Sequence, residues 1–389
     1  MPATSPNTDL PLPDEIAAAH SREVTACIAR EIAAAGGWIP FARYMELALY
    51  QPGLGYYAAG ARKLGAEGDF TTAPEISPLF ARALARQIGE AIEATGDDVI
   101  ELGAGTGRLA AGLLNELAAL GRLPARYRIL EVSADLADRQ RDCLEREAPE
   151  HVSRVEWVGA LPERIRGAVV ANEVLDALPV HLVVWHEDGI AERGVVCGTT
   201  GFEWSDRSLV RGVLHDTAKA LALQPPYLSE IAMQARALVA TLAERLEHGL
   251  LLFIDYGFGR HEYYHPQRSS GTLMCHYCHR AHADPFFLPG LQDITAHVDF
   301  TAIAEAGIDA GTRLAGYTTQ AQFLINCGIT ELLLAADPAR TGAYLPAVAG
   351  AQKLLSPAEM GELFKAIALT RGMQMPLRGF RAGDKSRLL

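Results

Sequence analysis

The stretch with the clearest chemical potential is DVIELGAGTGRLAAGLL, residues 98–114, where a glycine-rich turn separates a short apolar run from an amphipathic one. Its glycines, Gly103, Gly105 and Gly107, permit backbone conformations and close approaches that a Cβ would block, which suits a turn that meets a ligand. The dinucleotide fingerprint G-x-G-x-x-G needs a third glycine where this chain has Arg108. The Gly-Lys-Ser/Thr ending of a phosphate loop is also missing, which disfavours a nucleoside triphosphate.

Two carboxylates accompany this turn. Glu101 stands two positions before the first glycine, where its charge would repel a pyrophosphate and attract an aminoacyl sulfonium. The resulting E-x-G-x-G-x-G pattern resembles the S-adenosylmethionine site of Rossmann-like methyltransferases. Glu131 ends the next apolar run, where a carboxylate can accept both ribose hydroxyl protons, although this feature suits NAD equally well. A turn that serves packing alone is the disfavoured alternative, because glycines carry an entropic cost.

The segment ANEVLDALPV, residues 171–180, follows a third apolar run. Asn172 and Glu173 would lie beside the methionine end of the cofactor and face the methyl acceptor. Glu173 and Asp176 can share one face, hold a guanidinium through charge-assisted hydrogen bonds and help to remove its proton. In an equally open structural interpretation, Asn172 caps a helix and both acids are solvated near its start.

Alternating strands and helices must position these motifs. DVIEL, RYRILEV, GAVVAN and GLLLFIDYGF are typical of buried strands, and helical stretches separate them. The alternation predicts an α/β fold with a Rossmann-like, doubly wound, mostly parallel sheet, which binds its ligand at the carboxyl ends of the strands. Asp255 and Tyr256 end the last of these strands and are expected to form a wall of the site.

Four regions are expected along the chain. They are a disordered tail at 1–14, an N-terminal helical region with a cofactor-covering loop at 15–96, a Rossmann-like core at 97–330 with inserted helical and hairpin elements at about 180–245 and 258–297, and a C-terminal helix/strand region at 331–389 packed on the core. Within the first insertion, a β-hairpin turns near Asp188–Gly189 and helices fill roughly 212–247. Near the C-terminus, SPAEMGELFKAIALT is predicted to form a helix.

Histidines and cysteines supply two further candidates. CHYCHRAH, residues 275–282, brings Cys275, Cys278, His279 and His282 close together in sequence. Structural zinc sites need a second ligand pair at a distance, and none at the expected spacing stands out, so no metal is predicted. His297, in ITAHVDF, is a candidate acid/base group near the acceptor, against a favoured alternative as a hydrogen-bonded structural histidine.

Composition narrows the class of protein and its location. A net charge of −12 argues against a general nucleic-acid binder, which would show a basic face. Six scattered cysteines form no disulfide framework and fit a reducing compartment. The first residues lack the features of a secretory signal, and no apolar run is long enough to span a bilayer. These features predict a cytoplasmic protein without membrane insertion.

Six blocks, taken in order, resemble the MidA-like family of S-adenosylmethionine-dependent methyltransferases. The family comprises bacterial and mitochondrial relatives of the complex I assembly factor that methylates arginine. The resemblance covers about Gly53 to Phe300 and recurs more weakly toward the C-terminus. The blocks are GYYAAGARKLGAEGDFTTAPEISPLFARALA, ELGAGTGRLA, EVSADLADRQ, ANEVLDALPV, LLFIDYGF and PGLQDITAHVDF.

The resemblance implies roles for individual residues. The glycines of the turn line S-adenosylmethionine, Glu131 takes its ribose, Gly68 and Asp69 cover its methionine end, and Thr72 offers a hydroxyl partner. The full predicted cofactor-binding set is Gly68, Asp69, Thr72, Glu101, Gly103, Ala104, Gly105, Gly107, Glu131, Val132 and Asn172. The predicted catalytic residues are Glu173, Asp176 and His297.

The motifs predict a methyltransferase that acts on a nitrogen, and the resemblance implies protein arginine N-methylation linked to respiratory complex I assembly. Its expected partner is a protein substrate such as a complex I subunit, and its oligomeric state is open, with a homodimer among the options. We expect a bacterial cytoplasmic location; a mitochondrial matrix location would require a transit peptide outside this sequence. The alternatives are a non-catalytic assembly or scaffold protein that keeps the pocket, and an NAD-dependent oxidoreductase, which Glu101 and Arg108 disfavour.

Overall fold

The computed structural model describes residues 10–58, 72–96, 98–335, 339 and 341–389, and the chain divides into two compact units. Unit 1 combines Met1–Phe70, Ala177–Ala235 and His261–His297. Unit 2 combines Thr71–Asp176, Arg236–Arg260 and Val298–Leu389. Each unit is therefore assembled from three separate stretches of the chain.

Unit 2 contains an eight-stranded sheet in the order β15-β16-β10-β5-β2-β3-β4, with β14 paired to β10 beside this path. The five strands from β10 to β4 run parallel, whereas β16 is antiparallel to both β10 and β15. The strands are β2 (Asp98–Leu102), β3 (Tyr127–Leu130), β4 (Val155–Val158), β5 (Ile165–Asn172), β10 (Leu246–Phe258), β14 (Val298–Asp299), β15 (Arg313–Thr319) and β16 (Phe364–Arg371).

The register aligns the ends of the central strands. Leu102 of β2 pairs with Leu130 of β3 and with Ala171 of β5, and Ala171 pairs in turn with Phe253 of β10. The residues that follow these four positions therefore emerge at one edge of the sheet, which is where parallel sheets bind their ligands.

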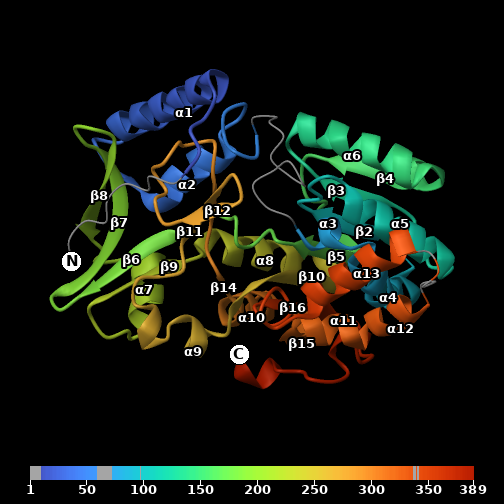
Figure 1. Ribbon diagram of the computed structural model, residues 1–389. Coiled ribbons are helices and arrows are strands. Elements are labelled where there is room, and N and C mark those ends of the chain that lie inside the picture. The colour runs from blue at the N-terminus through green and yellow to red at the C-terminus, as the bar shows by residue number, and fades with distance from the viewer. Residues whose placement is uncertain (1–9, 59–71, 97, 336–338, 340) are drawn as a thin grey trace. The chain divides into compact units, whose positions relative to one another are not determined.

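Helices cover the sheet of unit 2, and α11, α12 and α13 gather around α4 (Figure 1). The capping residues of α4 explain its limits: Ser77 Oγ accepts the N–H of Leu79 at 3.3 Å, and Gly96 ends the helix in left-handed backbone with φ 69°. The helices are α3 (Ala73–Ile76), α4 (Pro78–Thr95), α5 (Arg108–Ala119), α6 (Ala134–Glu147), α10 (Phe300–Asp309), α11 (Gln320–Asn326), α12 (Ile329–Leu334) and α13 (Thr341–Leu355), while α8 (Met233–Arg245) begins at the unit boundary.

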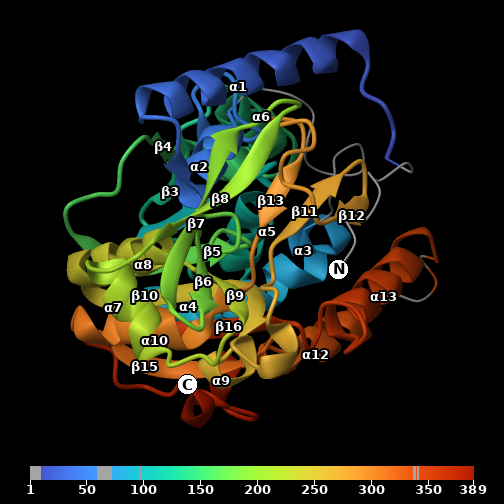
Figure 2. The ribbon, with the colours of Figure 1, turned by 90° about the vertical axis from the view of Figure 1, so that its left-hand side faces the viewer.

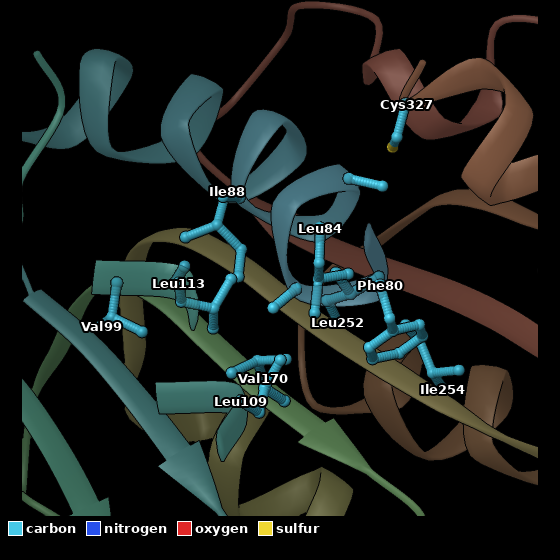
Figure 3. Packing of buried hydrophobic residues seen from close by; sticks show 14 of the residues in the cluster. Phe80, Leu84, Ile88, Val99, Leu109, Leu113, Val170, Leu252, Ile254 and Cys327 are labelled. Carbon is cyan, nitrogen blue, oxygen red and sulfur yellow. The ribbon is translucent and has the colours of Figure 1, made fainter. Parts of the chain in front are cut away.

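The core of unit 2 forms where α4 and α5 meet the strands. Phe80 and Leu84 of α4 point toward Leu252 and Ile254 of β10, and Ile88 lies beside Leu113 of α5 (Figure 3). Burial of such side chains stabilises the fold by about 1.5–3 kcal/mol each. The strands that carry the site are therefore anchored by the largest apolar cluster of the unit.

Unit 1 contains an antiparallel five-stranded sheet, β1-β7-β6-β9 with β8 paired to β7, and a separate three-stranded sheet, β12-β11-β13 (Figure 2). A second apolar cluster packs α1 and α2 against these strands. The strands are β1 (Ile39–Pro40), β6 (His181–His186), β7 (Gly189–Cys197), β8 (Phe202–Ser208), β9 (Tyr227–Ile231), β11 (Met274–Tyr277), β12 (Arg280–His282) and β13 (Asp293–Thr295). The helices are α1 (Glu15–Ala34), α2 (Phe41–Tyr50), α7 (Val213–Ala220) and α9 (Arg260–Tyr263), the last beginning at the unit boundary.

Several local predictions can be compared with this structure. The hairpin near Asp188–Gly189 is confirmed, since His186 of β6 pairs with Gly189 of β7. The prediction that helices fill roughly 212–247 is wrong in part, because β9 lies between α7 and α8. The helix predicted for residues 356–370 is also wrong, because β16 occupies its second half. Seven consecutive residues of β16 are buried, and a strand covered on both faces shows no alternation that would distinguish it from a helix.

None of the helices in the described part of the chain combines the length and the apolar character needed to cross a membrane.

Candidate cofactor and acceptor site

The glycine turn connects β2 to α5, and all three of its glycines have left-handed backbone. The φ angles of Gly103, Gly105 and Gly107 are 63°, 54° and 87°. A Cβ at Gly103 would lie 2.9 Å from a methyl carbon of Val174, and a Cβ at Gly107 would lie 3.0 Å from the Cα of Gln140. Glycine is therefore strongly favoured in this turn, by the backbone angles at all three positions and by the neighbouring atoms at Gly103 and Gly107.

Arg108, which replaces the third glycine of the dinucleotide pattern, takes part in a small polar cluster. Its Nε lies 3.4 Å from Glu75 Oε2, and its Nη2 lies 3.9 Å from Glu147 Oε1. The hydroxyl of Thr106, within the turn, donates a hydrogen bond to the other oxygen of Glu75. The departure from the dinucleotide fingerprint therefore serves to attach the short helix α3 to the glycine turn.

Glu131 follows β3 and is held by two donors. Its Oε1 accepts the N–H of Ser133 at 2.9 Å, and its Oε2 accepts Nε2 of Gln140 at 3.0 Å. The same amide nitrogen of Gln140 donates to the carbonyl of Gly105 at 3.1 Å, while Trp157 Nε1 donates to Gln140 Oε1 at 2.9 Å. Gln140, fully buried on α6, thus joins the glycine turn to Glu131.

Gln140 was not among the site residues predicted from the sequence. The available signal was a polar side chain on the apolar face of α6, nine positions after Glu131, which a buried hydrogen-bonding role explains. Next to Glu131, the predicted cofactor residue Val132 is 83% exposed. An apolar side chain so exposed at the end of a central strand offers a surface to a flat ring.

Glu101 lies within β2 and is 1% exposed. Its Oε2 accepts the hydroxyl of Tyr127, on the neighbouring strand β3, at 2.6 Å. Removal from water raises the pKa of Glu101 to about 7, and the hydrogen bond from Tyr127 partly opposes this rise. The carboxylate that sequence analysis assigned to the cofactor has a phenol as its hydrogen-bond partner in this structure.

The segment after β5, which carries Glu173 and Asp176, has an unusual backbone conformation. Asn172 is the last residue of β5, and Glu173 has left-handed backbone with φ 54°, which is uncommon for a residue with a side chain. Glu173 Oε1 accepts the Asn172 amide at 2.9 Å and the backbone N–H of Ala73 at 3.2 Å. The alternative in which Asn172 caps a helix is wrong, because residues 173–180 form bends and turns and no helix begins there.

Asp255 of β10 holds this segment in place. Its Oδ2 accepts the backbone N–H groups of Val174, Leu175 and Asp176 at 3.2, 2.9 and 3.3 Å. A single carboxylate oxygen therefore fixes three consecutive peptide groups. Asp255 was predicted to form a wall of the site. Its hydrogen bonds to the segment after β5 were not predicted from the sequence.

Three carboxylates are close enough to influence one another. Removal from water raises the pKa of Glu173 to about 7, with a further contribution from Asp176, against the opposing hydrogen bonds from Ala73 and Asn172. The pKa of Asp255 is also raised well above its ordinary value, by burial first and then by Asp176 and Glu173. Each of these acids would be stabilised in its charged form by a cation.

An unused acceptor lies in the same place. Asn172 is 8% exposed, and among the described residues its Oδ1 has no hydrogen-bond partner. A buried polar atom without a partner costs about 1–3 kcal/mol, so such atoms require an explanation. The site combines acids of raised pKa with the Asn172 amide oxygen. A positively charged hydrogen-bond donor would stabilise the charged acids and bind this oxygen.

The remaining predicted residues are placed as follows. Thr72 precedes α3 and makes no capping hydrogen bond through its side chain. Ala104 is buried within the glycine turn. Gly68 and Asp69 lie outside the described residues. His297 belongs to unit 1, where its backbone N–H donates to Thr272 Oγ1 at 3.1 Å, whereas Glu173 and Asp176 belong to unit 2.

The cysteines and histidines of residues 275–282 occupy β11, β12 and the turn between these strands. Cys275 is buried, whereas Cys278 is exposed. Within the part of the chain that the structure describes, no group of three or more His, Cys, Asp or Glu side chains is arranged to hold a metal ion.

Comparison with known proteins identifies the family. Residues 83–318 match the family described as "Putative S-adenosyl-L-methionine-dependent methyltransferase", which covers more than half of the 389 residues. The chain belongs to this family. The resemblance to MidA-like methyltransferases is therefore confirmed, and S-adenosylmethionine, the expected cofactor, is the one that the family description names.

Solved structures extend this assignment to the whole fold of this methyltransferase. A protein from Burkholderia thailandensis, crystallised with bound S-adenosyl-homocysteine, is 52% identical with a TM-score of 0.95, covering 98% of this chain and 100% of that one. A native structure from the same organism is 51% identical with a TM-score of 0.92 and the same coverage. The Rossmann-like methyltransferase fold is confirmed.

Curated relatives of this methyltransferase come from mitochondria. Protein arginine methyltransferase NDUFAF7 of Danio rerio is 28% identical over 382 residues, covering 88% of this chain and 86% of the relative. The corresponding protein of Mus musculus is 29% identical over 384 residues, covering 90% and 84%.

Proposed function

We propose that this protein transfers a methyl group from S-adenosylmethionine to a side-chain nitrogen of a protein substrate, and that the preferred acceptor is arginine. The observation that carries the proposal is the acceptor cluster after β5: Glu173 and Asp255 have raised pKa values beside Asp176, and Asn172 Oδ1 has no partner within the described part of the chain. A guanidinium carries one positive charge and five N–H donors in a plane, which suits such a cluster. The names of the mitochondrial relatives point to the same acceptor.

The glycine turn and the end of β3 fit the cofactor. Gly103, Gly105 and Gly107 keep the backbone accessible, and Glu131 offers carboxylate oxygens to a ribose. The exposed side chain of Val132 offers an apolar surface to adenine. When bound, S-adenosylmethionine supplies an electrophilic methyl group on a positively charged sulfur.

The other cofactor residues are proposed from sequence. Glu101 would attract the aminoacyl sulfonium by its charge, Ala104 would contribute backbone and Thr72 a hydroxyl. Gly68 and Asp69 remain predictions outside the described residues.

Glu173 and Asp176 are proposed to hold and deprotonate the acceptor. A carboxylate with a pKa of about 7 is poised between its two protonation states at neutral pH, which is favourable for a general base. Orientation of the nitrogen by two acids supplies much of the remaining rate, because methyl transfer needs no covalent intermediate with the protein. His297 stays a prediction as an additional acid/base group.

The substrate and location are proposed from the family. A protein substrate, with a respiratory complex I subunit as the first candidate, follows from the MidA-like resemblance. A cytoplasmic location in a bacterium agrees with the similarity to the Burkholderia proteins. The net charge of −12 favours a basic segment as the docking sequence.

Calorimetric titration of the purified protein with S-adenosylmethionine and, separately, with NAD tests the cofactor. Binding of the sulfonium that is weakened in Glu131→Ala supports the proposal, whereas tight binding of NAD would favour the oxidoreductase. Incubation with cell extract and methyl-labelled cofactor, followed by mass spectrometry for methylarginine, tests the acceptor. Cofactor binding without transfer to any protein would instead support a scaffold role.

A further inference from the structure

The short segment Thr72–Ile76 contacts both parts of the candidate site. It forms a single turn of helix, α3, in which the N–H groups of Glu75 and Ile76 bond to the carbonyl of Thr72 at 3.0 and 3.1 Å. Pro74 restricts the backbone at its start, and Ala73 is fully buried. Ala73 and Glu75 therefore belong to one compact, hydrogen-bonded turn.

One side of this segment is attached to the glycine turn through Glu75. Its carboxylate accepts the hydroxyl of Thr106 with one oxygen and lies 3.4 Å from Arg108 Nε with the other. The Glu75 side chain is 16% exposed, so water screens this charge pair less than it screens a surface pair. Thr106 lies between Gly105 and Gly107, so Glu75 supports the turn at its centre.

The other side of the segment reaches the acid cluster. The backbone N–H of Ala73 donates to Glu173 Oε1 at 3.2 Å. Ala73 and Glu75 are two residues apart in the same helical turn, so a displacement of one displaces the other. The contact chain from Thr106 through Glu75 and Ala73 to Glu173 lies entirely within unit 2.

We propose that Glu75 is a positioning residue that couples the glycine turn to the Glu173 carboxylate. The inference rests on the proposed function, because it takes the turn to be the cofactor site and Glu173 to face the acceptor. Glu75 would act through Thr106 and Arg108 on one side and through Ala73 on the other.

The proposed coupling predicts the direction in which the pKa of Glu173 changes. Glu173 faces the carboxylates of Asp176 and Asp255, the amide of Asn172 and the N–H of Ala73. The N–H of Ala73 lowers the pKa of Glu173, so loss of this hydrogen bond raises it. A variant that loosens α3 should therefore affect cofactor affinity and the titration of Glu173 together.

The test compares Glu75→Gln with Glu116→Gln in the full chain. Glu116 is a matched control, because its side chain is 12% exposed and pairs with Arg82 at 2.8 Å, also between helices of unit 2, without touching the glycine turn or Glu173. Calorimetric titration with S-adenosyl-homocysteine gives the affinity. A ¹³C-NMR pH titration of carboxyl-labelled glutamate, assigned with Glu173→Gln, gives the midpoint for Glu173. Neither readout needs a methyl acceptor.

We expect Glu75→Gln to weaken S-adenosyl-homocysteine binding about tenfold, since a charge-assisted contact is lost. The Glu173 midpoint should rise by between about half a unit and one unit. Glu116→Gln should change neither. Weaker binding with an unchanged Glu173 midpoint would reduce Glu75 to a structural residue and overturn the coupling, as would wild-type values in both readouts. If the wild-type chain binds no S-adenosyl-homocysteine, the proposed function fails first and the coupling fails with it.

Discussion

Two turns follow neighbouring strands of one sheet, and they reach left-handed backbone in opposite ways. The turn after β2 uses Gly103, Gly105 and Gly107, for which positive φ carries no steric penalty. The turn after β5 places Glu173 at φ 54° with a full side chain, a conformation that costs on the order of 1–3 kcal/mol. Asp255 offsets this cost by accepting three successive N–H groups.

The difference shows what each turn must present. A turn in which every second residue is glycine exposes much of its backbone, which suits a ligand that approaches closely from outside. The strained turn after β5 is fixed by its hydrogen bonds to Asp255, so few other conformations are open to Glu173. The direction of the Glu173 side chain is therefore fixed as well. The first turn can therefore be damaged by adding atoms and the second by removing them.

Glu173→Gln should have the largest effect. The substitution keeps the size of the side chain and removes the charge, so methyl transfer should fall on the order of a thousandfold, within the range for a lost general base. In the wild-type protein the pKa of about 7 means that the ionised form of Glu173 increases as the pH rises through 7. Transfer should therefore rise over that range and fall below it, and the initial rate measured from pH 5.5 to 8.5 checks this.

The variant itself should show no such rise near pH 7. Its affinity for S-adenosyl-homocysteine should stay within about threefold of wild type, because the glycine turn is intact. A wild-type profile that is flat between pH 6 and 8 would rule out the assignment of Glu173 as the titrating acid.

Gly107→Val adds atoms to the first turn. A branched side chain at φ 87° is strained, and its Cβ would lie 3.0 Å from the backbone of Gln140. We expect affinity for S-adenosyl-homocysteine to fall more than a hundredfold, equivalent to about 3 kcal/mol. Calorimetric titration gives the value. Gly121→Val is the control, because Gly121 has a φ of 67° but open space around it, so only stability should decrease.

Asp255→Ala removes the support behind the second turn. Three N–H groups lose their acceptor, so Glu173 should leave its position and methyl transfer should fall about ten- to a hundredfold. The free energy of unfolding should decrease by about 1–3 kcal/mol in a urea titration. Asp255→Asn, which keeps one acceptor oxygen, should retain more activity; equal activity in both variants would contradict the supporting role.

Trp157→Phe should have the smallest effect. It removes the N–H donor that binds Gln140 Oε1 at 2.9 Å while keeping an aromatic ring. Gln140 then has more freedom, so the contacts to Gly105 and Glu131 weaken and S-adenosyl-homocysteine should bind about two- to fivefold less tightly. Competition with labelled cofactor measures such a difference, and an unchanged affinity would mean that Trp157 does not help to hold Gln140 in place.

The first turn was predictable from sequence, whereas the support of the second was not. Gly103, Gly105 and Gly107 lie within five residues and follow an apolar run, so a local pattern reveals them. Asp255 is 80 residues from Leu175, whose N–H it accepts, and Glu75 is 31 residues from Thr106. Contacts of this kind depend on which strands become neighbours, and hydrophobic periodicity carries no such information.

The same reason explains the error in the C-terminal region. Four of the five parallel strands from β10 to β4 were recognised as short apolar runs, whereas β4 was not predicted. Residues 364–370 were predicted as part of a helix, because β16 is buried along nearly its whole length and lacks an alternating pattern. Its position between β10 and β15 was visible only from the pairing of the strands.

The position of β16 has a consequence for the newly made chain. β10 leaves the ribosome with Phe258, whereas its antiparallel neighbour β16 begins only at Phe364. At about 5–20 residues per second, translation of the intervening stretch takes roughly 5–20 s. During that interval one edge of β10 lacks its native neighbour and can pair with strands of other nascent chains. Correct production of this protein therefore depends on what shields that edge until the last strand is synthesised.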